Sequence, residues 1–275
     1  MFKSKVKRES DQFLINKKLM EKLINKRNML IERAIEKSNL KKDRFKSRGQ
    51  LSPRGRLNAI LDPDTFFLEL YNMANYLVED TNPDTSIPGA NLIAGIGYIS
   101  GVKCMIMIDD SGIKAGAASE ATIDKALGCL DIALKQKLPC VHLVESAGVD
   151  LPNYSVKLWS KFGSVFYKKA KLSAAGIPVI AILHGFSTAG GAYQIGMSDY
   201  VIGVKGNGMA ALAGSALLKA ATGENASNSD IGGVEMHSVV TGSVEYLVND
   251  DAESIVTVRK PVSYTHLTLP TTMLV

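Results

Sequence analysis

Alternation between short apolar runs and helix-like segments is the feature that most constrains the fold of this chain. Five apolar runs of strand length occupy residues 92–99, 102–109, 139–146, 178–185 and 199–206. Between them, apolar residues recur at helical spacing over residues 120–137, 156–175 and 189–197. Several runs are apolar on both faces, which is typical of strands that helices cover on both sides. The alternation therefore predicts an α/β domain built from crossover units.

The N-terminal part of the chain follows a different pattern. Over residues 9–40, apolar residues recur every three to four positions with Lys, Arg and Glu between them, which predicts one long helix. This helix is either an amphipathic arm packed on its own body or an arm that packs on another subunit. After a polar break, Ser52 and Pro53 match a helix N-cap and first helical residue, so a short helix is expected from Arg54 to Leu61.

The net charge of +5 conceals an asymmetry between the two parts of the 275-residue chain. Residues 1–60 carry 18 Lys and Arg against 6 Asp and Glu, whereas the remaining residues carry 14 against 21. The basic charge of residues 1–60, called the head here, indicates that this segment binds an anionic group. That group could belong to a partner surface, a nucleic acid or a phosphate-bearing ligand. Because the head lacks interleaved aromatic residues and nucleic-acid-binding motifs, we expect no nucleic acid partner.

Cysteine usage and hydropathy exclude several classes of protein. Cys104, Cys129 and Cys140 form no C-x-x-C pair, so a zinc ribbon is excluded, and we expect buried thiols and no metal. No apolar run reaches the length of a membrane span, and the N-terminus lacks the apolar stretch of a secretory signal. Glu9 and Asp11 disfavour an organellar transit peptide. These features favour a cytoplasmic protein over one of the mitochondrial matrix, with no membrane partner.

Two glycine-bearing turns at the ends of predicted strands are the strongest candidates for chemistry. They cover residues 144–150, VESAGVD, and residues 184–193, HGFSTAGGAY. Glycine lets a substrate approach the backbone closely, and free N–H groups at a helix start can stabilise a developing oxyanion. Two such turns from neighbouring strands can converge on one carbonyl oxygen. The alternative is that these glycines only permit tight turns and close helix packing.

The sequence contains no phosphate-binding loop and no H-E-x-x-H metal motif, and Ser187 does not lie in a nucleophile elbow. His142 lies inside an apolar run and is expected to be a core histidine. His184 precedes the second glycine turn and is expected to have a structural role. The economical interpretation is a reaction without a side-chain nucleophile, such as stabilisation of a thioester enolate by backbone amides.

Several segments in the same order resemble the carboxyltransferase (beta) subunit of biotin-dependent acyl-CoA carboxylases, closest to the methylcrotonoyl-CoA and geranyl-CoA carboxylase branch. They are SRGQLSPRGRLNAILDPDTFFLEL, DDSGIKAGAAS, LPCVHLVESAGVDLP, GIPVIAILHGFSTAGGAY, and LLKAATGE followed by IGGVEMHSVVTGSVEYLVNDD. The resemblance covers roughly residues 10–260, which correspond to the family's N-terminal domain. It implies an α/β, crotonase-like (ClpP/crotonase) fold, a spiral of β–β–α units, preceded here by the long N-terminal helix.

The resemblance also implies the chemistry. A biotin carboxylase or biotin carrier partner would deliver carboxybiotin, and its carboxyl group would pass to the alpha or vinylogous gamma carbon of an acyl-CoA thioester. The thioester enolate would be held by backbone amides, and this chain would be the acyl-CoA-binding half of the enzyme. The beta subunits of the family form homo-oligomers, with the active site at a subunit interface.

Site residues follow from the same resemblance. The family's oxyanion-hole glycines match Gly190 and Gly191, which are therefore the expected catalytic residues. The expected acyl-CoA-binding residues belong to the two turns, to the family's K-x-G-like loop and to the basic Arg44–Arg56 region; they are Ala147, Gly148, Ala189, Lys114, Gly116 and Arg54.

The expected domain organisation is a basic helical arm over residues 1–60 and an acyl-CoA-binding domain over residues 61–260. Residues 261–275 contain no Asp, Glu, Lys or Arg and resemble a translated cloning scar, so we expect a non-native tail there. We also expect the family's C-terminal biotin-binding domain to be missing. The chain departs from the family at Ala147, Phe186 and Ser215, where glycine, a small residue and proline are common.

Three alternatives stay open on the sequence alone. The chain could be the carboxyltransferase subunit of a biotin-dependent acyl-CoA decarboxylase, which shares this domain. It could be a crotonase-type hydratase, for which Glu145 is the nearest candidate carboxylate. It could also be a non-catalytic CoA-binding fragment.

Overall fold

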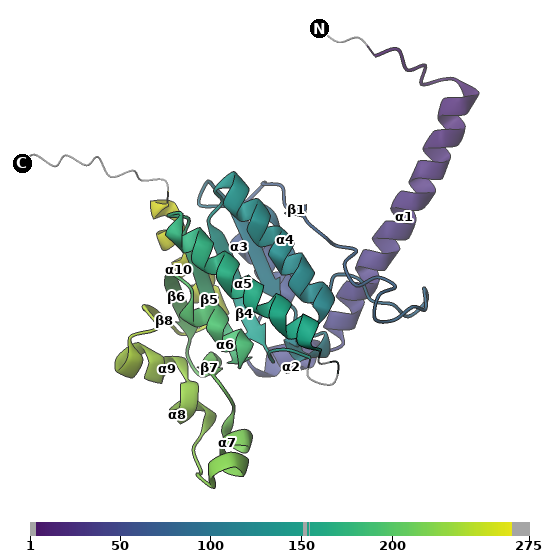
Figure 1. The fold of residues 1–275 in the computed structure, drawn as a ribbon. Coiled ribbons are helices and arrows are strands. Elements are labelled where there is room, and N and C mark those ends of the chain that lie inside the picture. The colour runs from purple at the N-terminus through teal and green to yellow at the C-terminus, as the bar shows by residue number, and fades with distance from the viewer. Residues whose placement is uncertain (1–3, 151–152, 154, 266–275) are drawn as a thin grey trace, which may run out of the picture.

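The computed structural model describes residues 4–150, 153 and 155–265, and its centre is one mixed sheet (Figure 1). The strands are β1 (Leu68–Glu69), β2 (Leu92–Ile99), β3 (Val102–Asp109), β4 (Cys140–Ser146), β5 (Val179–Thr188), β6 (Tyr200–Val204), β7 (Met209–Ala211) and β8 (Tyr246–Val248). They lie in the order β1-β2-β3-β4-β5-β6-β8, with β7 paired to β5. The five predicted apolar runs all form strands.

The sheet contains antiparallel and parallel pairs. β2 and β3 are joined by a tight turn and pair antiparallel. β1 also pairs antiparallel with β2, although a long segment separates the two strands. From β3 to β6 and on to β8 the pairing is parallel, because helices connect these strands. The sheet therefore has the α/β crossover architecture predicted from the apolar runs.

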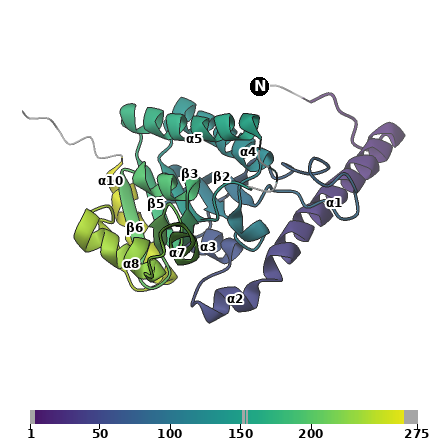
Figure 2. The same ribbon diagram turned by 60° about the horizontal axis from the view of Figure 1, so that its bottom comes forward.

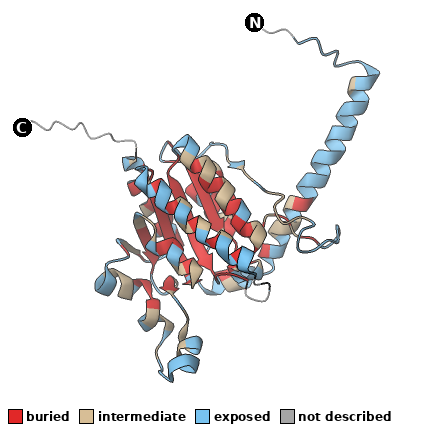
Figure 3. Cartoon of the chain, viewed as in Figure 1, coloured by how far each residue is buried: buried red, intermediate tan, exposed pale blue. Residues whose placement is uncertain are grey.

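Helices α4 (Glu120–Gln136) and α5 (Val156–Ala174) cover one face of the sheet (Figures 1 and 2). Both agree closely with the predicted ranges. Ser119 caps α4 and Ser155 caps α5, each accepting a hydrogen bond from a backbone N–H of the first turn. Their apolar stripes pack on the buried side chains of β2, β3 and β4. Figure 3 shows this sheet as the buried centre of the molecule.

Helices α3 (Pro53–Ile60) and α10 (Asp251–Tyr264) cover the opposite face. Ser52 caps α3 and Pro53 is its first residue, which confirms the predicted helix start. Leu57 and Ile60 are buried in the same core as α10, so the compact body includes part of the segment assigned to the arm.

Helix α1 (Asp11–Asn39) confirms the predicted long helix and projects away from the body (Figures 1 and 3). Only Leu30 and Ser38 of this helix are buried, whereas Leu14, Leu19 and Leu23 are each more than half exposed. The helix is therefore an arm held only at its C-terminal end, and most of its apolar side chains have no contact with the body.

The remaining helices are short. They are α2 (Lys42–Ser47), α6 (Gly190–Gly196), α7 (Ser215–Thr222), α8 (Asn228–Gly232), α9 (Val234–Met236), the 3-10 turn η1 (Lys114–Gly116) and the π-helical turn η3 (His237–Thr241). Helix α10 continues into the segment predicted to be non-native, with Pro261 and Val262 buried; residues 266–275 lie outside the described residues. No helix in the described part of the chain is long and apolar enough to cross a membrane.

Candidate active site

The second glycine turn joins β5 to α6. Strand β5 continues to Thr188, three residues past the predicted run, and α6 begins at Gly190. Ala189 between them has φ 50° and ψ −119°, a left-handed conformation that disfavours any residue with a Cβ atom. Its N–H donates to the carbonyls of Ala211 and Leu212. The amides of Gly190 and Gly191 donate to no acceptor within the described residues, as expected for the first residues of a helix.

The first glycine turn follows β4. Ser146 is the last residue of the strand, and its pairing with β5 is shifted in register after Val144. Gly148 has φ 85°, which favours glycine, and its N–H donates to Ser146 Oγ at 3.2 Å. Ala147 is exposed, and its amide also donates to no acceptor within the described residues.

The structure brings the two turns into contact. A Cβ atom at Gly148 would lie 3.1 Å from the carbonyl oxygen of Thr188 and 3.5 Å from Cβ of Ala189. A Cβ atom at Gly191 would lie 3.0 Å from the carbonyl oxygen of Ser146. Both glycines therefore permit a close approach between the turns. The free amides of Ala147, Gly190 and Gly191 therefore belong to two turns that touch each other.

The K-x-G-like loop, η1, lies against the first turn. Ser146 Oγ donates to the carbonyl of Gly116 at 3.1 Å, and the N–H of Ala118 donates to the carbonyl of Gly148 at 2.7 Å. Gly116 has φ 75°, and a side chain there would clash with the carbonyl of Glu145. Three of the four segments that the sequence analysis singled out as site candidates, the two turns and η1, thus meet in one place.

Lys114, at the start of η1, points to two carboxylates. Its Nζ lies 2.7 Å from Glu79 Oε2 and 3.4 Å from Asp150 Oδ2, and its side chain is 44% exposed. Partial burial lowers the pKa of Lys114, but the hydrogen bond and charge of Glu79, together with Asp150, outweigh that effect and raise it. Lys114 is therefore a cation at the edge of the site.

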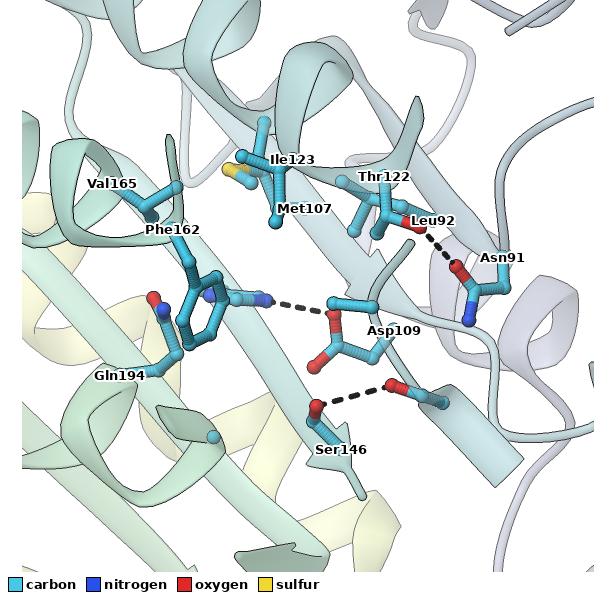
Figure 4. A pocket seen from close by; sticks show the side chains of 15 residues that line it. Asn91, Leu92, Met107, Asp109, Thr122, Ile123, Ser146, Phe162, Val165 and Gln194 are labelled. Carbon is cyan, nitrogen blue, oxygen red and sulfur yellow. Dashed lines mark hydrogen bonds and ion pairs between the residues drawn. The ribbon is translucent and has the colours of Figure 1, made fainter. Parts of the chain in front are cut away.

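A small cavity of about 40 Å³ lies beneath the turns, between the sheet and helices α4 and α5 (Figure 4). It is lined by residues from all three segments, Gly116, Ser146 and Gly191. Its apolar wall comes from β2, β3, α4 and α5 and consists of Leu92, Met107, Ala118, Ile123, Ala126, Phe162 and Val165. Its polar wall consists of Asn91, Asp109, Thr122, His142 and Gln194. The cavity connects the turns to the apolar interior.

Of the predicted site residues, only Gly116 and Gly191 line this cavity. Arg54 and the alternative candidate Glu145 also have other partners. Arg54 donates two hydrogen bonds of 2.8 Å to the carboxylate of Glu69, which occupies its guanidinium group. Glu145, the candidate carboxylate of a hydratase, packs over Gly185 and lies 3.7 Å from the guanidinium of Arg48. Its Oε2 lies 3.8 Å from Nδ1 of the buried His184, whereas its neighbour Ser146 lines the cavity.

The buried groups agree with the sequence predictions. Cys104, Cys129 and Cys140 are buried thiols, and burial raises their pKa to about 12, 12 and 11. His142 is a core histidine, as predicted, but it also lines the cavity. His184 is completely buried beneath the second turn, and burial lowers its pKa well below the usual value.

The fold and the paired turns define a carboxyltransferase fold of the crotonase-like class. The model of the carboxyl transferase domain family matches residues 44–273. The chain belongs to this family, which confirms the resemblance found in the sequence.

Individual relatives are consistent with this assignment. The methylcrotonoyl-CoA carboxylase beta chain of Arabidopsis thaliana is 38% identical over 95% of this chain and 44% of its own length. A probable biotin-dependent acyl-coenzyme A carboxylase beta2 subunit of Mycobacterium tuberculosis is 42% identical over 78% of this chain and 39% of its own length. The crystal structure of the P. aeruginosa geranyl-CoA carboxylase beta subunit aligns with a TM-score of 0.86 at 38% identity, covering 95% of this chain and 48% of that one. The chain thus spans less than half the length of these relatives.

Proposed function

We propose that this chain is the acyl-CoA-binding half of a carboxyltransferase, which transfers a carboxyl group from carboxybiotin to an acyl-CoA thioester. The observation that carries the proposal is the contact between two turns whose backbone amides, at Ala147, Gly190 and Gly191, have no acceptor within the described residues. Such amides are preorganised donors for an oxygen that gains negative charge during the reaction. Membership of the carboxyl transferase domain family supports the same chemistry.

The chain's own residues would act on the thioester carbonyl. The amides of Gly190 and Gly191 would donate hydrogen bonds to the carbonyl oxygen. They would hold the enolate that forms when the alpha carbon, or the vinylogous gamma carbon of an unsaturated thioester, loses its proton. Each well-aimed donor contributes roughly 3–4 kcal/mol to such a step. Carboxybiotin, when bound, supplies the carboxyl group and, once that group has left, the base that accepts the proton. The enolate carbon then forms the new carbon–carbon bond.

The exposed surface beside the second turn is consistent with a carboxyl donor that another polypeptide carries. Ala147 is exposed, and so are Tyr193 at 57%, Phe186 at 43% and Leu212 at 78%, close to the turns along the chain. A donor carried by another polypeptide could therefore reach the turns from solvent. The proposed partners are a biotin carboxylase or biotin carrier subunit and further copies of the beta subunit, because the relatives are beta chains of biotin-dependent carboxylases.

The remaining candidate residues have supporting roles in the proposal. Gly148 and Ala189 shape the two turns, and Ala147 and Gly116 border the acyl-CoA. Lys114 would contact the anionic part of the CoA. Arg54 would bind CoA only by exchanging its present partner Glu69, so its contribution is proposed to be the smaller. The alternative hydratase reaction gains no support from Glu145, whose buried side chain lies beside Arg48 and His184 and does not line the cavity.

The proposal is tested by calorimetric binding to the purified chain. The ligands are 3-methylcrotonyl-CoA and a CoA thioether that carries a nitronate, an anion with the shape of the thioester enolate. We expect the nitronate to bind more tightly. Gly190→Pro removes one amide and should abolish most of that preference, whereas Gly190→Ala adds a Cβ atom but keeps the amide. A Gly190→Pro variant that keeps the wild-type preference for the nitronate would contradict the role of the Gly190 amide.

A further inference from the structure

Three ionisable side chains, two of them buried and one, Asp109, partly buried, form a chain of polar contacts beside the cavity. Lys169 of α5 is completely buried, and its Nζ lies 3.4 Å from Nδ1 of His142 on β4. The other ring nitrogen of His142, Nε2, lies 3.1 Å from Oδ1 of Asp109 at the end of β3. We refer to Asp109, His142 and Lys169 as the buried triad. Figure 4 labels Asp109 and Gln194, which lie on opposite sides of the cavity.

The two ends of the buried triad reach the two glycine turns. Lys169 Nζ donates to the carbonyl of Gln194 at 3.2 Å, and Gln194 belongs to α6, the helix that Gly190 begins. Asp109 Oδ2 accepts a hydrogen bond of 3.2 Å from the N–H of Glu145, the residue before Ser146. The buried triad therefore links the end of β4 to α6 from below the site.

Stability alone does not account for these groups. Burial lowers the pKa of Lys169 to about 8 and also lowers the pKa of His142, although the charge of Asp109 partly opposes both effects. A buried ionic group carries a large desolvation penalty, and apolar replacements of similar volume are often neutral or stabilising. The buried triad instead fixes the orientation of the groups it contacts, because hydrogen bonds restrict orientation more narrowly than apolar contacts do.

We propose that Asp109, His142 and Lys169 are positioning residues that fix the amides of both turns relative to each other. They would do so through the carbonyl of Gln194 and the N–H of Glu145, without touching the acyl-CoA oxygen themselves. The inference rests on the proposed function, since the placement of these amides matters for chemistry only if they hold an oxyanion. A displacement of about 1 Å in such a site can cost roughly a hundredfold in rate.

A second buried lysine provides a matched control. Lys125 of α4 is 2% exposed, and burial lowers its pKa to about 8, as for Lys169. Its Nζ donates to the carbonyl of Gly89 at 3.2 Å, far along the chain from both turns. Lys125→Met and Lys169→Met therefore remove the same charge from a similar environment, but only the second breaks the link to α6.

The first test follows the backbone amides by two-dimensional 15N–1H NMR on the full chain without ligand. In Lys169→Met, we expect the amide resonances of Gly148, Gly190 and Gly191 to shift well beyond their shifts in Lys125→Met. Equal or smaller shifts in Lys169→Met would overturn the proposal. If Lys169→Met does not fold, Asp109→Asn serves as the second variant, since it keeps the shape of the buried triad but removes its negative charge.

The second test measures the ratio of affinities for the nitronate and thioester ligands. We expect Lys169→Met to lower this ratio about tenfold or more, and Lys125→Met to leave it within twofold of the wild-type value. A wild-type chain without any preference for the nitronate would contradict the proposed function, while the amide shifts would still decide the positioning role. A wild-type preference that Lys169→Met retains in full would overturn the positioning role alone.

Discussion

The ring of Phe162 occupies the space in which a side chain at Gly190 would begin. Phe162 lies on α5, is buried, and stacks edge-on against Phe166 with a centroid distance of 5.1 Å. Gly190 is the first residue of α6. The absence of a side chain at Gly190 therefore lets α5 pack directly against the start of α6, where the free amides lie.

This contact predicts that Gly190→Ala destabilises the chain. The added methyl group must displace the Phe162 ring, and overpacking of this kind costs about 1–3 kcal/mol. Phe162→Leu in the Gly190→Ala background should recover part of the loss, because the two residues touch. Urea unfolding of the wild-type chain, both single variants and the double variant measures the coupling.

Gly163, which lies on α5 with Phe162, is the control for that experiment. A Cβ atom at Gly163 would meet no heavy atom within 4 Å. Gly163→Ala should therefore stabilise the chain by about 0.5–1 kcal/mol through helix propensity alone. Identical unfolding midpoints for Gly190→Ala and the wild-type chain would show that Phe162 does not restrict the site.

Backbone strain at Ala189 leads to a second prediction. At φ 50° and ψ −119°, an alanine is strained and a glycine is not. Ala189→Gly should raise the free energy of unfolding by about 0.5–1 kcal/mol, net of the added entropy of the unfolded chain. Ala192→Gly, inside α6, should lower it by a similar amount. A lower unfolding midpoint for Ala189→Gly would contradict the strained geometry.

The low pKa of Lys169 predicts a specific pH dependence. Burial lowers this pKa from the ordinary 10.5 to about 8 in the folded chain. Between pH 8 and 10.5, the unfolded chain therefore binds more protons at this residue than the folded chain does. Stability must then rise with pH in this window, and the contribution is lost as the pH falls through 8.

The measurement compares the wild-type chain with Lys169→Met, so that effects common to both proteins cancel. One such effect is the raised pKa of Cys104, about 12, which makes stability fall above pH 9. We expect the free energy of unfolding of the wild-type chain, relative to that of the variant, to rise by up to about 3 kcal/mol between pH 7.5 and 10. A difference in unfolding free energy that stays constant over this range would show that Lys169 titrates normally.

The position of Lys114 predicts a modest effect on CoA affinity. Lys114 is partly exposed and already pairs with Glu79 and Asp150, so its interaction with a CoA phosphate should resemble that of a surface ion pair. Lys114→Ala should weaken CoA binding about two- to fivefold, with a smaller effect at high salt. Lys103→Ala, an exposed lysine near the other end of β3, should leave CoA affinity unchanged. Equal affinities for the two variants would contradict the role of Lys114.

Periodicity and turn chemistry predicted most of the fold. The helices at α4 and α5 and the strands at β2 and β3 follow from local patterns that tertiary packing reinforces, so their bounds agree within a few residues. The contact between the two turns could be anticipated, because the turns follow two strands that were expected to be neighbours. The strain at Ala189 could not, because an alanine in a left-handed conformation gives no local signal and is imposed by the flanking strand and helix.

The buried triad left a signal in the sequence that the pattern analysis did not use. Leu158, Phe162, Val165 and Leu172 form the buried stripe of α5, and Lys169 occupies a position of the same stripe. A lysine at a position that should be apolar indicates a buried partner. Its identity required the structure, since Lys169 and His142 are 27 residues apart.

The N-terminal helix α1 contacts the body only near its C-terminal end. Arg33 donates to the carbonyls of Pro83 and Ser86, which fixes the C-terminal end of α1 on the body. The preceding turns expose Leu14, Leu19 and Leu23. The sequence alternative of an arm packed along its own body does not describe these turns, and packing on another subunit stays a prediction.

The most direct test of the account is the infrared spectrum of an acyl-CoA labelled with 13C at the thioester carbonyl and bound to this chain. Hydrogen bonds from the amides of Gly190 and Gly191 should polarise the carbonyl and lower its stretching frequency relative to the free ligand. Gly190→Pro should move the stretching frequency most of the way back to that of the free ligand, and Gly190→Ala should move it back less. A bound carbonyl with the frequency of the free ligand would contradict the proposed oxyanion site.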